Sequence, residues 1–437
     1  MPRQAACYPT PDFQAPAVKL LHRTFLTFSL GLLVGALAWM LPAAAADVHW
    51  TPAGVQQLGD ADRAVWSIDS APGHPNILLV ATSGHGVLRS VDRGATWTAA
   101  IPKVDAWLVR FDPDHAGVAY AGTAGAGLFK SVDGGVTWTP SNQGLTDLDV
   151  RAIALNKDLL VAGTSHGVFS SGDAAATWRS LGLADLNIDA VAILPTAKGL
   201  TLLAGADNGV STGGSYLFRS QDLSASWSSI HLPGDPGIVA SVSVGGLPAS
   251  ASDRPVVVGT AGGLFRSDDG ATTWTQVGGL PETDFNLALF NPANPEQLYV
   301  ASDGDLGAGG VFRSLDRGST WSPVGFGLPA HPRVTALALQ PAAPLTVFAA
   351  TWNPTTLQVG LYHIPDPDAT SGSTQVAPKP NSAAANPPAA GAPSRSAATP
   401  GAAPTVSLAA RLAIAAGAVM LVLIAVAVVG ARRFGSS

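Results

Sequence analysis

A carboxylate recurs along this chain in one short context, Ser-x-Asp-x-Gly-x-Thr-Trp, first as "SVDRGATW" at 90–97. An aspartate in such a setting could act as a catalytic acid or base, ligate calcium, or hold a turn together. Two further copies, at 131–138 and 314–321, are intact, and degenerate copies begin at 171, 220 and 267. Successive copies start 41, 40, 49, 47 and 47 residues apart, and a period of this length is typical of repeat architectures.

The number of available ligands favours the turn. Ca²⁺ takes roughly 6–8 oxygens, whereas each copy offers one carboxylate, or two at Asp268 and Asp269. Ser and Asp side chains instead bond nearby backbone N–H groups, and the Trp offers a large apolar surface to bury between repeats. We therefore expect a structural role for the aspartate and tryptophan of each box, namely Asp92, Trp97, Asp133, Trp138, Asp173, Trp178, Asp222, Trp227, Asp269, Trp274, Asp316 and Trp321.

Three short apolar runs precede every box, and a fourth begins at the box Trp. In the first repeat the three runs are "AVWSID" (64–69), "ILLVATS" (77–83) and "GVLRS" (86–90). Such runs, rich in β-branched residues and bounded by Gly, Pro, Asn and Asp, are typical of strands. Four strands per repeat of 40–49 residues predict the blade of a β-propeller.

The ends of the repeat region predict how the ring closes. Seven sets of the first three strands are present but only six boxes, and the seventh set, within 333–364, has no fourth strand of its own. The segment "HWTPAGVQQLG" (49–59) resembles "TWTPSNQGLTD" (137–147) and has no strands before it. We therefore expect this N-terminal strand to complete the last blade, which gives an all-β, single seven-bladed propeller over 47–365 with four-stranded blades.

The boxes resemble the Asp-box, or BNR, repeat, and the resemblance covers the whole of 47–365. The region looks like the photosystem II assembly factor propellers of the Ycf48/HCF136-like kind and the sialidase-like propellers, and it is similar to sortilin-type propellers and to xyloglucanases. The resemblance implies the fold more strongly than it implies a function, because one fold hosts many activities. It leaves open a binding or assembly role and, as the alternative, a glycoside hydrolase with degenerate motifs.

The segments outside the propeller predict a membrane protein. Residues 1–46 read as a signal peptide or signal anchor, with basic residues ahead of an apolar run. The Pro/Ala/Ser-rich segment 366–405 is expected to be a disordered stalk. A transmembrane helix is expected over 406–431, followed by a cytoplasmic tail at 432–437 that begins with two arginines. We expect a single-pass protein of the cell membrane with the propeller extracytoplasmic and the helix in the lipid bilayer.

Composition excludes some partners and some chemistry. The net charge is −6, 12% of residues are charged and no basic patch is apparent, so nucleic acid is not an expected partner. The one cysteine, Cys7, precedes the first apolar run, so the propeller has no thiol chemistry. His85 and His166 occupy equivalent loops, but zinc needs three or four convergent ligands. We expect no metal and no cofactor.

Catalytic residues are hard to place. The sialidase reaction needs an arginine cluster and a tyrosine with a glutamate partner, but the chain has only Glu282 and Glu296, and the propeller tyrosines lie in strand runs. A two-carboxylate glycosidase could use aspartates outside the repeat pattern, such as Asp69, Asp207, Asp303 and Asp305, but their spacing singles out no acid and base. We therefore predict no catalytic residue.

Departures from the repeat indicate a binding surface on the face opposite the boxes. Trp66 and Trp107 fall at one level of adjacent blades, and Asp69 and Arg110 share another, where they could equally serve blade packing and an inter-blade ion pair. The longer loop 302–310 adds Asp303 and Asp305, and the loop 351–360 adds Trp352. These seven residues are the candidate contacts for a protein or glycan at the outer membrane surface, bound without catalysis.

Overall fold

The computed structural model describes residues 49–54, 64–207, 216–223, 226–234, 236–247, 253–280, 284–302, 310–329, 333–341, 344–353, 356 and 358–369. All of them belong to the compact unit Met1–Thr374. The predicted signal segment 1–46, the predicted stalk beyond residue 369 and the predicted membrane span 406–431 lie outside these residues. Among the residues described, no helix is long and apolar enough to cross a membrane.

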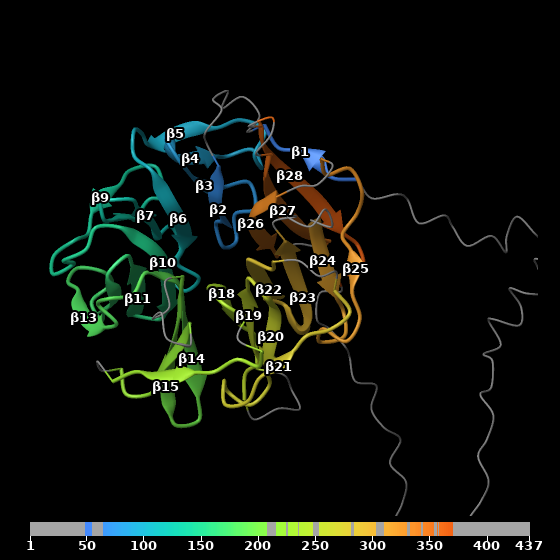
Figure 1. Cartoon of the computed structure of the whole chain (residues 1–437). Helices are drawn as coiled ribbons and strands as arrows, with labels where there is room; N and C mark the ends of the chain where they lie inside the picture. The colour runs from blue at the N-terminus through green and yellow to red at the C-terminus, as the bar shows by residue number, and fades with distance from the viewer. Residues whose placement is uncertain are drawn as a thin grey trace, which may run out of the picture. The chain divides into compact units, whose positions relative to one another are not determined.

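Seven four-stranded antiparallel sheets follow one another around a ring, which confirms the predicted seven-bladed propeller (Figure 1). The first strand of each blade lies nearest the ring axis; these are β2 (Val65–Ser70), β6 (Ala106–Phe111), β10 (Val150–Asn156), β14 (Ile188–Thr196), β18 (Val239–Val244), β22 (Leu287–Asn291) and β26 (Arg333–Gln340). The second strands are β3 (Leu78–Thr82), β7 (Ala119–Thr123), β11 (Leu159–Thr164), β15 (Gly199–Ala206), β19 (Val256–Thr260), β23 (Asn294–Ser302) and β27 (Leu345–Asn353).

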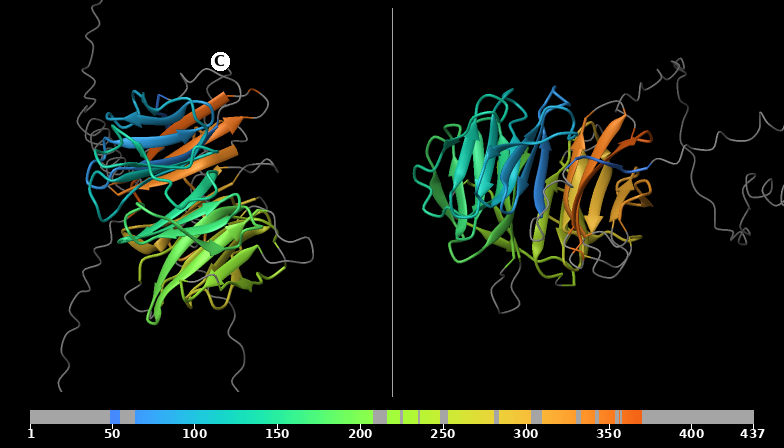
Figure 2. Two further views of the ribbon diagram at one scale, coloured as in Figure 1. Left: turned by 90° about the vertical axis from the view of Figure 1, so that its left-hand side faces the viewer. Right: turned by 90° about the horizontal axis from the view of Figure 1, so that it is seen from above.

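The outer half of each blade is made of two more strands. The third strands are β4 (Gly86–Ser90), β8 (Leu128–Ser131), β12 (Gly167–Ser171), β16 (Leu217–Ser220), β20 (Gly263–Ser267), β24 (Gly310–Ser314) and β28 (Gln358–Asp366). The fourth strands, at the periphery, are β5 (Thr98–Ile101), β9 (Thr139–Pro140), β13 (Arg179–Gly182), β17 (Ser228–Ile230), β21 (Thr275–Gln276), β25 (Ser322–Pro323) and β1 (Thr51–Pro52). Figure 2 shows the same sheets from two further sides.

The apolar core lies between neighbouring blades, so the middle strands are covered on both faces. All five residues of β3, β7 and β19 are buried, which explains why these runs are continuously apolar instead of alternating. Between blades 1 and 2, for example, Leu79 and Ala81 of β3 pack with Ala106 and Val109 of β6. Blade stacking is therefore the source of burial, and no blade encloses a core alone.

The ring closes as predicted, between the two ends of the repeat region. Strand β1 pairs antiparallel with β28, with Thr51 opposite His363. Trp50 is 5% exposed, and its Nε1 donates to the carbonyl oxygen of Val324 at 2.6 Å. Trp178 makes the equivalent bond, from its Nε1 to the carbonyl oxygen of Ser141. In both cases the acceptor lies three residues after the Trp of the preceding blade: Ser141 follows Trp138, and Val324 follows Trp321. Trp50 therefore takes the place of a seventh box tryptophan.

Each box holds a turn between the third and fourth strands. The Asp92 carboxylate accepts from the Ser90 hydroxyl at 2.8 Å and from the Thr96 N–H and hydroxyl at 2.8 and 2.6 Å. The Thr96 bonds, followed by that of Ser90, lower the pKa of Asp92 to about 2. The aspartates of the other boxes bond the equivalent serine and the following hydroxyl residue in the same way.

The turn needs two consecutive residues in the left-handed region. Arg93 and Gly94 have φ of 60° and 88°, and in the third box Ala174 and Ala175 have φ of 56° and 69°. L-residues resist this conformation and glycine does not, which accounts for the glycine at the second of these positions in all three intact boxes.

A basic residue precedes the box Ser in every blade with a box except the third, and it joins neighbouring blades. Arg89 Nε donates to the carbonyl oxygen of Gly134 in the next box at 2.8 Å, and Lys130 Nζ donates to that of Ala174 at 2.7 Å. The same contact joins Arg219 to Ala271 and Arg266 to Arg317. This residue therefore recurs because it ties one blade's third strand to the next blade's turn.

Blade 7 keeps the aspartate of a box that is otherwise lost from the sequence. Asp366, the last residue of β28, lies two residues after Ile364, the aligned counterpart of Ser90, just as Asp92 lies two residues after Ser90, and it is one residue beyond the predicted domain end at 365. Its buried carboxylate accepts from the Tyr299 hydroxyl at 2.7 Å and forms an ion pair with Arg313. Asp366 thus pairs with the basic side chain of the preceding blade, which in blades 1, 2, 4 and 5 donates instead to a carbonyl oxygen of the next turn.

Candidate functional site at the mouth of the central channel

A cavity of about 440 Å³ lies on the ring axis and is lined by residues from the first strand of all seven blades. Much of its wall is small or apolar, with Ala152, Ala190, Ala288 and Ala338 among the lining residues. The charged side chains and both tryptophans are contributed by blades 1 to 4, and blade 6 adds Phe290. The cavity is therefore asymmetric although the blades repeat.

A β-bulge near the start of the first strand recurs in six of the seven blades, and five of the six skipped residues line this cavity. The pairing of β2 with β3 skips one residue between Val65 and Ser67, and the skipped residue is Trp66. The same shift occurs in β6, β10, β14, β18 and β26, where the skipped residues are Trp107, Arg151, Asp189, Ala240 and Thr335. Bulges redirect a side chain out of the ladder and are common beside functional sites. We call these six residues the bulge ring.

The bulge ring forms a continuous series of contacts across blades 1 to 4. The Trp66 and Trp107 rings lie 5.7 Å apart between centroids, tilted by 54°. The Arg151 guanidinium carbon lies 5.4 Å from the Trp107 ring centroid, and Arg151 Nη1 pairs with Asp189 Oδ1 at 3.1 Å. An aromatic pair, a cation–π contact and an ion pair thus follow one another around the mouth.

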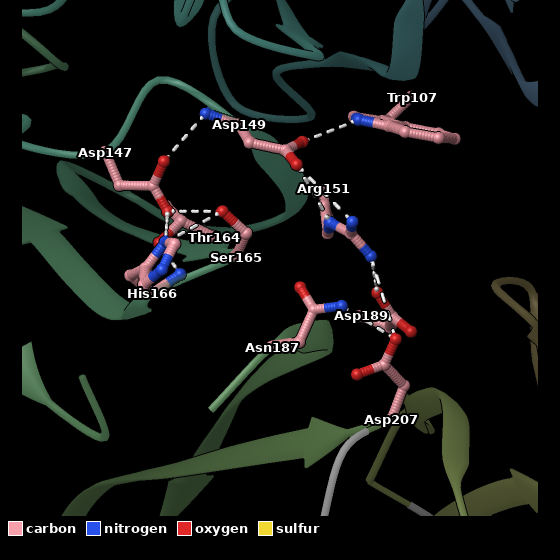
Figure 3. A network of polar contacts seen from close by, with 10 residues as sticks. All are labelled: Trp107, Asp147, Asp149, Arg151, Thr164, Ser165, His166, Asn187, Asp189 and Asp207. Atoms are coloured by element: carbon pink, nitrogen blue, oxygen red, sulfur yellow. Dashed lines mark hydrogen bonds and ion pairs between the residues drawn. The ribbon is translucent and has the colours of Figure 1, made fainter. Parts of the chain in front are cut away.

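Acidic residues hold the cation of this series in place (Figure 3). The Asp149 carboxylate accepts from Trp107 Nε1 at 2.7 Å and from Arg151 at 3.4 Å. Asp207 lies 3.8 Å from Arg151 Nη1 and accepts from Asn187 Nδ2 at 2.7 Å. The Arg151 side chain is therefore fixed between carboxylates of three positions, with its planar face against Trp107.

A second, smaller group lies beside this network. The Asp147 carboxylate accepts from the Ser165 hydroxyl at 2.8 Å and lies 3.2 Å from His166 Nδ1. The His166 side chain is 74% exposed, so the ring is held at one edge only. Among the described residues, no group of three or more His, Cys, Asp and Glu side chains has the geometry of a metal site.

Two carboxylates that line the cavity have raised pKa values, chiefly because burial disfavours their charged form. Burial, followed by the neighbouring Asp207 carboxylate, raises the pKa of Asp189, and Arg151 only partly opposes this. Deeper in the channel, burial raises the pKa of Asp69 against the opposing charge of Arg110. A cation placed next to either carboxylate would therefore stabilise its charged form.

The structure brings four of the seven candidate residues together. Trp66 and Trp107 are in contact, and Asp69 and Arg110 line the cavity one level deeper on the same two strands. No ion pair within 4.0 Å joins Asp69 to Arg110 in the described part of the chain. The Asp69 carboxylate instead accepts the backbone N–H of Phe111 at 2.8 Å, which ties blade 1 to blade 2.

The other three candidates are not brought to this cavity. Trp352 pairs with Arg333 across β26 and β27, with the guanidinium carbon 6.0 Å from the ring centroid, and it is not among the residues that line the channel. Asp303 and Asp305 lie outside the described residues. Sequence reasoning missed Arg151 and Asp189, although both occupy the Trp66 position of their strands, in "VRAIAL" and "IDAVAIL".

The geometry gives little support to hydrolysis. The Asp189 and Asp207 carboxylates both lie against Arg151 Nη1, at 3.1 and 3.8 Å, instead of flanking an open gap as the carboxyl pair of glycosidases does. Tyr120 and Tyr299 are buried, and desolvation raises the pKa of each to about 12, which opposes a role as nucleophile. The arrangement is better suited to holding a ligand than to proton transfer.

Solved propellers share this fold at low sequence identity. YCF48 from Cyanidioschyzon merolae matches with a TM-score of 0.52 and 15% identity, over 74% of this chain and 100% of that one. The GH74 xyloglucanase from Xanthomonas campestris matches with a TM-score of 0.50 and 16% identity over 72% of this chain, which spans 55% of the enzyme. The extracellular domain of a one component system from B. thetaiotaomicron matches with a TM-score of 0.51 and 14% identity, over 72% of this chain and 40% of that one. No protein-family model and no curated protein matches the sequence.

Proposed function

We propose that this protein is a non-catalytic binding module whose ligand site is the mouth of the central channel. The observation that carries the proposal is the bulge ring, in which Trp66, Trp107, Arg151 and Asp189 of four successive blades contact one another beside a 440 Å³ cavity. A concave site with an aromatic surface and a few oriented polar groups is the usual form of a ligand site. The box face, by contrast, uses its polar groups within the turns.

We further propose that the propeller is extracytoplasmic and tethered to the membrane. The support comes from the sequence alone: an apolar run in 1–46, a Pro/Ala/Ser-rich segment, and an apolar span followed by Arg432 and Arg433. A flexible tether would let the mouth search for partners near the membrane surface and raise their effective concentration. Recognition or assembly at that surface suits such an arrangement better than solution chemistry.

Site-specific crosslinking of the full-length protein in its native membrane tests this proposal. A photoreactive residue at Leu148, exposed beside the mouth, is compared with one at Val132, exposed on the box face. We expect a discrete adduct, identified by mass spectrometry, from Leu148 and none from Val132. Adducts from Val132 alone would place the partner on the wrong face and contradict the proposal. Turnover of any glycan that is lost in Asp189→Asn would contradict the non-catalytic role.

A further inference from the structure

Large side chains of the bulge ring contact one another on only one side of the cavity mouth. The bulge ring carries large or charged side chains in blades 1 to 4, but Ala240 in blade 5 and Thr335 in blade 7. The ring of Trp107 is contacted by Arg151 on one side and by Trp66 on the other. Trp66 has Trp107 on one side, and the bulged residue of the blade on its other side is the short Thr335. The Trp66 side chain remains 39% exposed. Its aromatic surface therefore borders the cavity.

An acidic residue, Asp69, lies near Trp66, three residues later on β2, and lines the same cavity. Within the described part of the chain its carboxylate forms no ion pair and accepts bonds only from backbone N–H groups, those of Ser70 and Phe111 at 2.9 and 2.8 Å. A carboxylate desolvated in this way is stabilised by a cation brought next to it. An exposed indole and a poorly compensated carboxylate thus face one cavity from one strand.

The protein already shows which cation suits its tryptophans. Arg151 lies over Trp107 at 5.4 Å, and Arg333 lies 6.0 Å from the ring centroid of Trp352. A guanidinium stacks on indole and is more weakly hydrated than an ammonium, so it loses less on entering such a site. Among the described residues, no arginine lies over Trp66, and the next bulged residue on that side is Thr335.

We propose that the mouth binds an arginine side chain of a partner protein, with the guanidinium over the Trp66 ring and its donors directed toward Asp69. This inference rests on the proposed function and adds the chemistry of the ligand to it. The partner residue would extend the existing series of Trp, Trp, Arg and Asp contacts by one cation at its open end. Arg110, the cation nearest Asp69 in the cavity wall, favours a single bound arginine over a densely basic segment.

Peptide binding to the full-length protein, measured by calorimetry, tests the inference. The probes are three peptides of Gly and Ser that differ at one central position, which is arginine, citrulline or glutamate. Citrulline keeps the shape of arginine without its charge. We expect the arginine peptide to bind at least tenfold more tightly than the citrulline peptide, and the glutamate peptide to bind most weakly.

Matched variants separate the site from general electrostatics. Asp69→Asn and Asp158→Asn remove the same charge, but Asp158 lies in an exposed turn outside the cavity. We expect Asp69→Asn and Trp66→Ala each to weaken arginine-peptide binding at least fivefold. Asp158→Asn should leave it unchanged, and Trp66→Phe, which keeps an aromatic face, should retain most of it. An unchanged urea midpoint in each variant shows that the fold is intact.

The possible results are distinguishable from those of the crosslinking test. Equal binding of the arginine and citrulline peptides, or equal losses in Asp69→Asn and Asp158→Asn, would overturn the inference. So would tighter binding of a neutral oligosaccharide at the mouth. If adducts still form from Leu148 in any of these cases, the binding function stands with a different ligand. If no adduct forms and no peptide discriminates, both proposals fail.

Discussion

Replacement of Trp50 by alanine is the sharpest test of how this ring is held closed. Trp50 lies at the start of the only N-terminal segment that contributes a strand to blade 7 in the described part of the chain, and it packs with Val311, Val324 and Val334. A ring of blades has edges at its two ends until that strand is added. Loss of the indole should therefore weaken the junction of blades 6 and 7 while leaving the other blades with their contacts.

The magnitude follows from burial and one hydrogen bond. A tryptophan buries about 150–250 Å², which at about 25 cal/mol per Å² gives about 4–6 kcal/mol as an upper bound. Measured Trp→Ala costs of about 3–5 kcal/mol agree with this. Trp50→Phe also removes the bond from Nε1 to the Val324 carbonyl, which is 2.6 Å long. It should therefore lower the free energy of unfolding by about 1 kcal/mol more than Trp→Phe at a tryptophan that makes no such bond. Trp321, whose Nε1 has no partner among the described residues, supplies that comparison.

Urea unfolding of the full-length protein with near-UV circular dichroism measures the effect. We expect Trp50→Ala to lower the free energy of unfolding by about 3–5 kcal/mol. Trp50→Phe should cost about 1 kcal/mol more than Trp321→Phe. Hydrogen exchange should show that the amides of β28 lose protection in Trp50→Ala while those of β7 do not. A cost below about 1 kcal/mol, with β28 still protected, would refute the closure by β1.

Three further perturbations test the turns and the seventh blade. The pKa of Asp92 is lowered to about 2, so its contribution to stability is present above the unfolded pKa of about 4 and is lost as pH falls toward 2. Asp92→Asn should flatten this acid limb in a thermal melt recorded across pH. Gly135→Ala, at φ of 82° and with the new Cβ 2.9 Å from Leu79, should destabilise by about 2–4 kcal/mol, whereas Ala175→Gly should change stability little. Asp366→Asn should cost about 1–3 kcal/mol, because it removes the buried partner of Arg313 and leaves that arginine paired only with the exposed Asp368, and unchanged urea unfolding would disprove a stabilising role for the Asp366 pair.

The repeat made most of the fold predictable. Strand identity, blade number and closure by the N-terminal strand all follow from spacing and apolar periodicity, since the same pattern appears in every repeat. The shared level of Trp66 and Trp107 could also be read from aligned strands. The shared level of Asp69 and Arg110 follows on the same basis, but of the two roles that it predicts, a binding rim or an inter-blade ion pair, the ion pair does not form, and Asp69 bonds a backbone N–H of the next blade.

Other parts of the site depended on contacts that alignment does not show. Arg151 and Asp189 occupy the position of Trp66 in their own blades, but they look like ordinary strand residues until the bulge turns them toward the channel. Asp366 was overlooked because the rest of its box has diverged. Its role became visible only where Arg313 reaches it from the preceding blade.

The sequence by itself determined the architecture, because each repeat encodes a local rule: strands from apolar runs, turns from Ser, Asp and Gly, and stacking from one Trp. Only the tertiary structure decided the site, because a ring brings together residues about 40 positions apart that have no local reason to meet. Around the axis, the bulged residues of blades 1 to 4 become neighbours of one another. The order Trp66, Trp107, Arg151, Asp189 acquires chemical meaning only when the ring places them side by side.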